Sequence, residues 1–219
     1  MTTTKAMLIN TARQYPFPGN QNFTRYNQGW GWPSVQDLYD LRDKIHIVNE
    51  WDVLAHLERK AYWFYVAPGE AQLRATMTYA DPEGTVPSTI HRINDLHLKV
   101  TAPAGTVYWG NQGLLTGTHS TPGGTPNVID SVENVFVKSP AAGLWLVEVS
   151  AAEVNQDGHV QTPRKDVDYA LVVSGIGSGR DRSRTALDLA STGRGDLTVT
   201  LRNLPAGWHE GWKIGRAHV

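Results

Sequence analysis

From about residue 44 onward, the sequence alternates apolar and polar residues with a period of two. The segment QLRATMTY, residues 72–79, is the clearest case. Its odd-numbered residues, from Leu73 to Tyr79, are apolar, and its even-numbered residues are polar. Successive side chains of a β-strand point to opposite faces, so this segment is predicted to be a strand with one buried face.

Eight segments of this kind follow one another, each bounded by Pro, Gly, Asn or Asp and with no helical pattern between them. A parallel sheet needs helical crossovers, so the arrangement predicts a mainly β fold. We expect an antiparallel β-sandwich, jelly-roll-like, over residues 44–175. The predicted strands are 44–48, 61–66, 72–79, 96–101, 106–109, 132–137, 144–149 and 169–173.

Helical signal is confined to the start of the chain. A threonine run offers an N-cap for a short helix in which Ala6, Ile9 and Ala12 fall near one face, and Pro16 ends the pattern. A second short helix is predicted over 34–41, directly after a proline.

The sequence after residue 175 breaks the strand pattern. Residues 176–184, IGSGRDRSR, are rich in Gly and Arg and are predicted to be a linker. Residues 197–201, LTVTL, predict one more strand, with almost nothing after it that could pair with it. The last residues, 214–219, resemble the translation of a sequencing adapter and are expected to be foreign to the natural protein. We therefore expect 176–219 to hold a linker and the truncated start of a further domain.

Composition narrows the classes of partner. Twenty Lys and Arg against twenty-one Asp and Glu give a formal net charge of -1, which offers no large field to recruit nucleic acid or an anionic membrane. Because cysteine is absent, disulfides, thiolate metal ligands and a cysteine nucleophile are excluded. No stretch approaches the roughly 20 apolar residues of a membrane span, and the first apolar run is too short for a signal-peptide core. We expect neither a nucleic-acid partner nor a membrane partner.

Residues 25–32, RYNQGWGW, place two tryptophans in a segment that resembles a linker. They could form an aromatic platform for a ligand or a joint between two structural units. The two glycines permit close backbone packing, and the two indoles can bury large apolar faces between the helix and the sandwich. The joint is the favoured interpretation, and its residues are Asn27, Gln28, Gly29, Trp30, Gly31 and Trp32.

The order of these segments resembles the C-terminal part of subtilisin-like serine proteases that carry a β-sandwich after the catalytic domain. KAMLINTA resembles the last long helix of the subtilase domain, and YNQGWGWPSVQDLYD resembles the turn and short helix that follow it. HIVNE is similar to the strand that leads into the sandwich. MTYADPEG, INDLHLKVTAPAGTVYWGN, DSVENVFVKSPAAGLWLVEV and YALVVSG then follow in the family's order, so the resemblance covers about residues 5–175.

The resemblance implies that residues 1–43 are the end of a catalytic domain and that 44–175 are an accessory sandwich. The aspartate, histidine and serine of the family's triad all precede this region, so the chain alone is expected to be inactive. It further implies a secreted parent protein that cleaves protein substrates, in which the upstream catalytic domain is the sandwich's partner. No cofactor is required.

Two local patterns bear on chemistry. GTHST, residues 117–121, superficially resembles a subtilase nucleophile motif, but PGGTP follows it in place of the helix that would expose the serine. Asp81 and Asp95 could converge as oxygen ligands for calcium; alternatively, each caps its own loop. His97 stands where relatives carry a further aspartate, and its nitrogen is a poor calcium ligand.

Tryptophans support a rival class, a non-enzymatic carbohydrate-binding or adhesion module built on the same sandwich. Such modules stack sugar rings on exposed indoles, and Trp109 at a strand end is the best candidate to face a ligand. Trp63 and Trp145 lie in strand contexts where an indole more often fills the core. The feature that would indicate adhesion is the integrin-binding tripeptide Arg-Gly-Asp at residues 194–196.

Overall fold

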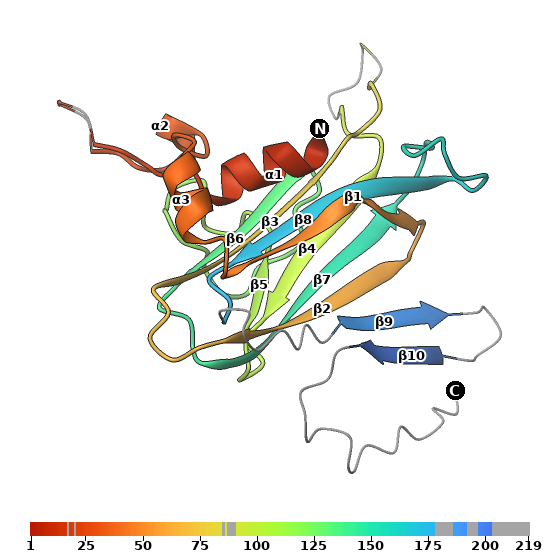
Figure 1. Ribbon diagram of the computed structural model, residues 1–219. Coiled ribbons are helices and arrows are strands. Elements are labelled where there is room, and N and C mark those ends of the chain that lie inside the picture. The colour runs from red at the N-terminus through yellow and green to blue at the C-terminus, as the bar shows by residue number, and fades with distance from the viewer. Residues whose placement is uncertain are drawn as a thin grey trace, which may run out of the picture.

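The computed structural model describes residues 1–16, 18–19, 21–84, 86 and 91–177, together with the backbone of two strands at 186–191 and 197–202. The tripeptide 194–196 and the adapter-like residues 214–219 lie outside the described residues. Figure 1 shows a sandwich of strands with one helix lying across its upper face.

Two antiparallel sheets form the sandwich. The first sheet has the order β1-β8-β3-β6 and the second has the order β10-β9-β2-β7-β4-β5. Facing orders of 1-8-3-6 and 2-7-4-5 are those of a jelly roll, so the predicted fold class is confirmed. The strands are β1 (Ile45–Ala55), β2 (Arg59–Val66), β3 (Gln72–Tyr79), β4 (Asp95–Thr101), β5 (Val107–Trp109), β6 (Val132–Lys138), β7 (Gly143–Glu153), β8 (Asp166–Ser174), β9 (Ala186–Ser191) and β10 (Leu197–Arg202).

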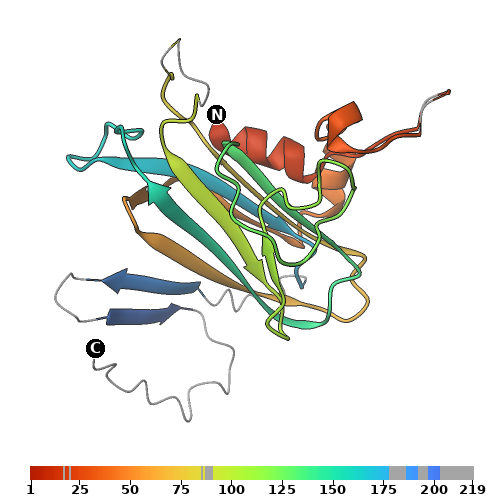
Figure 2. The ribbon, with the colours of Figure 1, turned by 180° about the vertical axis from the view of Figure 1, so that it is seen from behind.

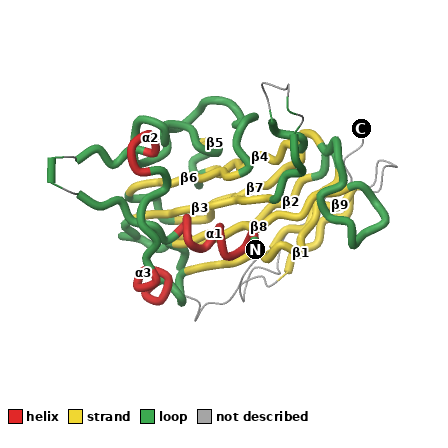
Figure 3. The backbone as a smooth tube through the Cα atoms, turned by 90° about the horizontal axis from the view of Figure 1, so that it is seen from above, coloured by secondary structure: helices red, strands yellow, loops and turns green. Residues whose placement is uncertain are grey.

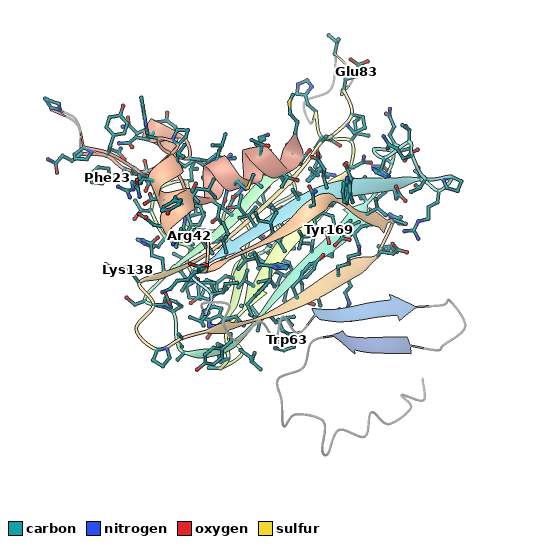
Figure 4. The ribbon with its side chains drawn as sticks, in the orientation of Figure 1. Phe23, Arg42, Trp63, Glu83, Lys138 and Tyr169 are labelled. Atoms are coloured by element: carbon teal, nitrogen blue, oxygen red, sulfur yellow. The ribbon has the colours of Figure 1, made fainter. Side chains whose placement is uncertain are left out.

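The main hydrophobic core lies between the two sheets. Alternate residues of each strand point into it, as the period of two predicts. Trp145 is 1% exposed and fills the core, where its indole nitrogen donates to the carbonyl of Ala141. Trp63 was also expected there, but it is only half-buried, because Tyr62 and Phe64 on either side of it point inward. Figure 4 shows Trp63 at β2, on the side away from the four-stranded sheet.

Strands β3 and β8 are buried on both faces, which differs from the single buried face predicted for residues 72–79. Leu73 and Met77 point into the main core, whereas Thr76 and Thr78, on the opposite face, have no exposed surface. The cause is helix α1 (Thr2–Asn10), which lies over this outer face. Figure 3 shows α1 resting on the strands from above.

The start of α1 is held in a way that the sequence did not predict. The threonine run makes no side-chain cap; instead the Glu50 carboxylate of β1 accepts hydrogen bonds from the backbone nitrogens of Thr2 and Thr3, at 2.8 and 3.3 Å. A carboxylate at a helix N-terminus satisfies free N–H groups and complements the helix dipole.

Two shorter helices follow, α2 (Arg25–Gln28) and α3 (Val35–Asp40). The prediction of a helix after Pro33 is confirmed, and Ser34 is its N-cap: the hydroxyl accepts from the backbone nitrogen of Asp37 at 3.1 Å. Helix α2 was not predicted, because four residues are too few to show a helical period.

Residues 197–201, predicted to be a strand, lie in β10, and their partner precedes them in the sequence. Strand β10 pairs with β9, which precedes it in the sequence, and β9 pairs with β2 of the sandwich. Figure 2 shows this hairpin beside the larger sheet.

Candidate functional site: the joint on the outer face of the four-stranded sheet

Helix α1 is fixed to the sandwich by one buried polar side chain, Asn10. Its amide nitrogen donates to the carbonyls of Arg74 and Val172 and to the hydroxyl of Thr76, at 3.2, 3.1 and 3.1 Å. Its amide oxygen accepts from the Ser174 hydroxyl at 2.6 Å. Asn10 has no exposed surface, and its bonds to Thr76, Val172 and Ser174 are made away from water. A buried network that is satisfied in this way fixes one position of the helix on the sheet.

The joint itself is centred on Trp30, whose ring lies between a cation and another aromatic ring. The Arg25 guanidinium lies 4.5 Å from the indole centroid, a cation–π distance. On the sheet, Phe136 of β6 meets the indole edge to face, with centroids 6.3 Å apart and an interplanar angle of 83°. Trp30 therefore connects the segment before the sandwich to the sandwich's outer face.

The carboxylate of Asp130 fixes the position of Arg25. Arg25 donates two hydrogen bonds to it, at 2.9 and 2.8 Å. The side chains of Asn111 and Asn127 donate to the same carboxylate at 2.9 and 2.8 Å. The bond from Arg25, and after it that from Asn127, lowers the pKa of Asp130, although partial burial opposes the shift. A two-bond arginine–carboxylate pair fixes orientation as well as distance.

The glycines of the joint have the conformations that glycine alone adopts easily. Gly29 and Gly31 have φ values of 60° and 101°. A Cβ atom on Gly31 would lie 2.6 Å from the carbonyl oxygen of Arg13. This close approach lets Arg13 and Trp32 exchange two backbone hydrogen bonds, at 2.9 and 2.7 Å.

The two polar residues of the joint close the loop before it. The amide nitrogen of Gln28 donates to the carbonyl of Tyr15 at 2.9 Å, and its oxygen accepts from the Tyr15 backbone nitrogen at 3.2 Å. The side chain of Asn27 donates to the carbonyl of Asn22 at 3.0 Å. Both side chains therefore bind the backbone within the segment.

The expectation that both tryptophans are buried is wrong for Trp32. Its side chain is 65% exposed, and its ring meets that of Tyr15 edge to face, with centroids 5.8 Å apart. Gly31 turns the chain between the two indoles, so that Trp30 faces the sheet while Trp32 points to solvent.

The predicted calcium residues have protein partners. Both oxygens of Asp81 accept backbone hydrogen bonds, from Ile93 at 2.7 Å and from Asn94 at 2.8 Å. Asp95 is 2% exposed; one oxygen lies 3.0 Å from the ring nitrogen of His97, and the other makes no hydrogen bond. Within the described ranges, no group of three or more His, Cys, Asp or Glu residues is placed to hold a metal ion. The geometry gives Asp81 the loop-closing role that was the alternative to calcium binding.

Trp109 is half-buried on the outer face of the larger sheet. Its ring meets His97 nearly perpendicularly, with centroids 6.4 Å apart, and the Lys99 ammonium lies 5.8 Å from its centroid.

In the GTHST loop, Ser120 exchanges hydrogen bonds with the backbone of Phe136: its hydroxyl accepts at 2.9 Å and its nitrogen donates at 2.8 Å. These bonds cover the free edge of β6.

Sequence reasoning missed the polar residues that hold the joint. Asn10 bonds to Ser174, and Arg25 pairs with Asp130; these partners are 164 and 105 residues apart in the sequence, so no local pattern indicates them. The only signal in the sequence was the position of Arg25 at the start of RYNQGWGW.

Comparisons with known proteins assign no family. No protein-family model matches the chain. No curated protein matches it either. Among solved structures, the chain is similar to the lipase BlEst2 of Bacillus licheniformis in its propeptide form, with 13% identity and a TM-score of 0.33. The match covers 64% of this chain and 23% of the lipase chain. At this level of likeness we infer nothing about this chain from the lipase.

None of the helices in the described part of the chain has the length and apolar character needed to cross a bilayer.

Proposed function

We propose that this chain is the C-terminal part of a secreted subtilisin-like serine endopeptidase, and that its sandwich stabilises the catalytic domain. In the intact protein, a serine upstream of residue 1 attacks the peptide carbonyl, and the present residues take no direct part in cleavage. The ordered resemblance over residues 5–175 is the sequence basis of this proposal.

The joint is the observation that carries the proposal. A segment that only linked two independent units would need no built contact with the sandwich. Here Trp30 packs against Phe136, and Arg25 pairs with Asp130, 105 residues away in the sequence. Contacts of this kind support a rigid attachment of the preceding segment to the sandwich.

Exposed apolar side chains near the joint give further support. Tyr15, Tyr26, Trp32, Val35 and Tyr39 are 44%, 85%, 65%, 74% and 61% exposed. Large apolar side chains that gather within one segment of a surface commonly mark a place where another protein unit packs. In our proposal the catalytic domain covers them.

The upstream coding sequence is the first test. We expect an aspartate, a histidine and a serine in subtilase order within the few hundred preceding residues. A coding sequence without them would contradict the protease proposal and leave the carbohydrate-binding or adhesion module as the alternative. That alternative predicts retardation of the present chain in a polysaccharide gel.

The stabilising role has its own test in the full-length protease. Arg25→Gln and Trp30→Ala are expected to shorten the half-life of activity at elevated temperature and to leave kcat/KM for a short peptide unchanged at low temperature. Arg59→Gln, in an exposed arginine of β2, is the control and should inactivate at the rate of the natural protein. Equal half-lives for all four proteins would contradict the stabilising role.

A further inference from the structure

A cleft of about 230 Å³ opens beside the joint, between the segment that precedes α2 and the edge of the four-stranded sheet. The cleft is lined by side chains from two strands and from two loops. They include Gln72 and Arg74 of β3, Phe136 of β6, Thr118 and His119 of the GTHST loop, and Phe23. Figure 4 shows Phe23 and Lys138 at the same end of the molecule.

Arg74 is the charged residue of the cleft, and it lacks a counter-ion. Its guanidinium lies 4.0 Å from the centroid of Phe136, and one terminal nitrogen donates to the carbonyl of Ala12 at 2.9 Å. Its Nε is shielded from solvent and makes no hydrogen bond, so a ligand in the cleft would meet the terminal nitrogens; no carboxylate among the described residues lies within ion-pair distance of the guanidinium. The acid that acts on it at longer range, Asp37, is already paired with Arg13.

This arrangement has an energetic cost. Burial lowers the pKa of Arg74 to about 10, because the surroundings disfavour the charged form. Arg74 is half-buried, and a cation in such surroundings is normally matched by an anion. An uncompensated arginine at the wall of an open cleft therefore points to an anion from outside the chain.

His119 lies in the wall of the cleft within reach of two cations, Lys138 and Arg74. Its pKa is lowered first by burial and then by the charges of Lys138 and Arg74. Thr118 and Gln72 hold the ring through its two nitrogens, at 3.0 and 3.4 Å. An anion in the cleft would offset both cations and make protonation of His119 easier.

We propose that this cleft binds a carboxylate that is attached to a small apolar or aromatic body. The guanidinium edge of Arg74 suits the planar carboxylate, while the side chains of Gln72 and Thr118 supply neutral polar contacts. Phe136 and Phe23 provide apolar surface for the rest of the ligand, and none of the lining side chains is acidic. The carboxylate belongs either to a free small acid or to the C-terminus of a peptide. This proposal does not depend on the protease proposal.

Sodium benzoate and benzamide test the proposal on the chain as it exists, because they differ chiefly in the charge. In NMR titrations, benzoate is expected to shift the signals of His119 and of the Arg74 side chain and to raise the pKa of His119, whereas benzamide does neither. Equal shifts from benzoate and benzamide would overturn the proposal. Inorganic phosphate that bound as tightly as benzoate would overturn the assignment to a carboxylate with an apolar body.

The peptide Ala-Ala-Phe, with a free or an amidated C-terminus, separates the two sources. Tighter binding of the free peptide than of benzoate would identify a peptide terminus as the ligand, and weaker binding would identify a free acid. Equal binding of the free and amidated peptides would contradict the role of the carboxylate.

Variants complete the test. Arg74→Gln is expected to weaken benzoate binding by about tenfold or more, and to raise the pKa of His119 in the absence of ligand. Because Arg74 also packs on Phe136, the exposed Lys138→Glu is a second variant with little risk to folding. It is expected to weaken binding several-fold and to raise the same pKa. Arg59→Gln is the matched control, with unchanged binding and an unchanged pKa of His119. Binding that was equal in Lys138→Glu and Arg59→Gln would contradict the proposal.

Discussion

Replacing Asn10 by alanine should detach α1 from the sandwich. The substitution removes four hydrogen bonds, three of them buried, and leaves the Ser174 hydroxyl without its acceptor. Each bond contributes about 1 kcal/mol net, and an orphaned buried group costs about 1–3 kcal/mol. The amide nitrogen has only two hydrogens for its three acceptors, and the hydroxyl of Thr76 keeps its bond to Asn134, so we expect a total loss of about 2–4 kcal/mol rather than the full sum. For a chain of this size, that lowers the Tm by roughly 5–15 °C.

Urea unfolding and thermal melts of Asn10→Ala measure the loss, and hydrogen exchange locates it. We expect backbone amides of α1 to lose protection before those of β3. Leu8→Ala is the control, because Leu8 lies on the same helix and is 38% exposed. The double variant Asn10→Ala with Ser174→Ala should lose less than the sum of the single variants, since it leaves no unpaired hydroxyl. A loss for Asn10→Ala no larger than that of Leu8→Ala would refute the role given to the network.

Three further perturbations test the joint, the core and the metal prediction. Gly31→Ala should destabilise by about 1–3 kcal/mol more than Gly69→Ala in urea melts, because both glycines have positive φ but only Gly31 faces a backbone within 3 Å. Glu133 is fully buried, and burial raises its pKa well above 4.5. Its charged form therefore destabilises the fold increasingly as the pH rises above 4.5. Glu133→Gln should raise the stability at pH 8 and change it little at pH 4. If Asp81 and Asp95 hold calcium, as the sequence predicts, a chelator lowers the Tm and added calcium restores it; a melt that responds to neither contradicts that prediction.

The strands could be predicted because each one has a single dominant requirement, a buried face towards the other sheet. Every one of the eight predicted segments falls on one of β1 to β8, and residues 72–79 match β3 in full. The unpredicted strand β9 follows a segment rich in Gly and Arg, where the composition of the linker concealed the start of a short strand.

The position of α1 could not be predicted, because it depends on polar contacts between distant parts of the chain. Locally, Asn10 looks like the polar end of an apolar run, and Glu50 looks like a solvated residue of a strand. Only the packed fold makes one of them a buried anchor and the other a helix cap. The same contacts explain why Thr76 and Thr78, predicted to face outward, are buried.

For the joint, the sequence predicted a role from residue types but not the direction of each side chain. Trp30 and Trp32 are equivalent in composition, yet one packs on Phe136 and the other is exposed. The difference comes from the φ of 101° at Gly31 and from its contact with Arg13, neither of which leaves a mark in a single sequence.

Phe136 connects the joint to the neighbouring cleft. The ring of Phe136 contacts both Trp30 and the guanidinium of Arg74. Its backbone is hydrogen-bonded to Ser120 of the GTHST loop. Phe136 is therefore a neighbour that Trp30 and Arg74 share. The joint and the cleft therefore share a structural element.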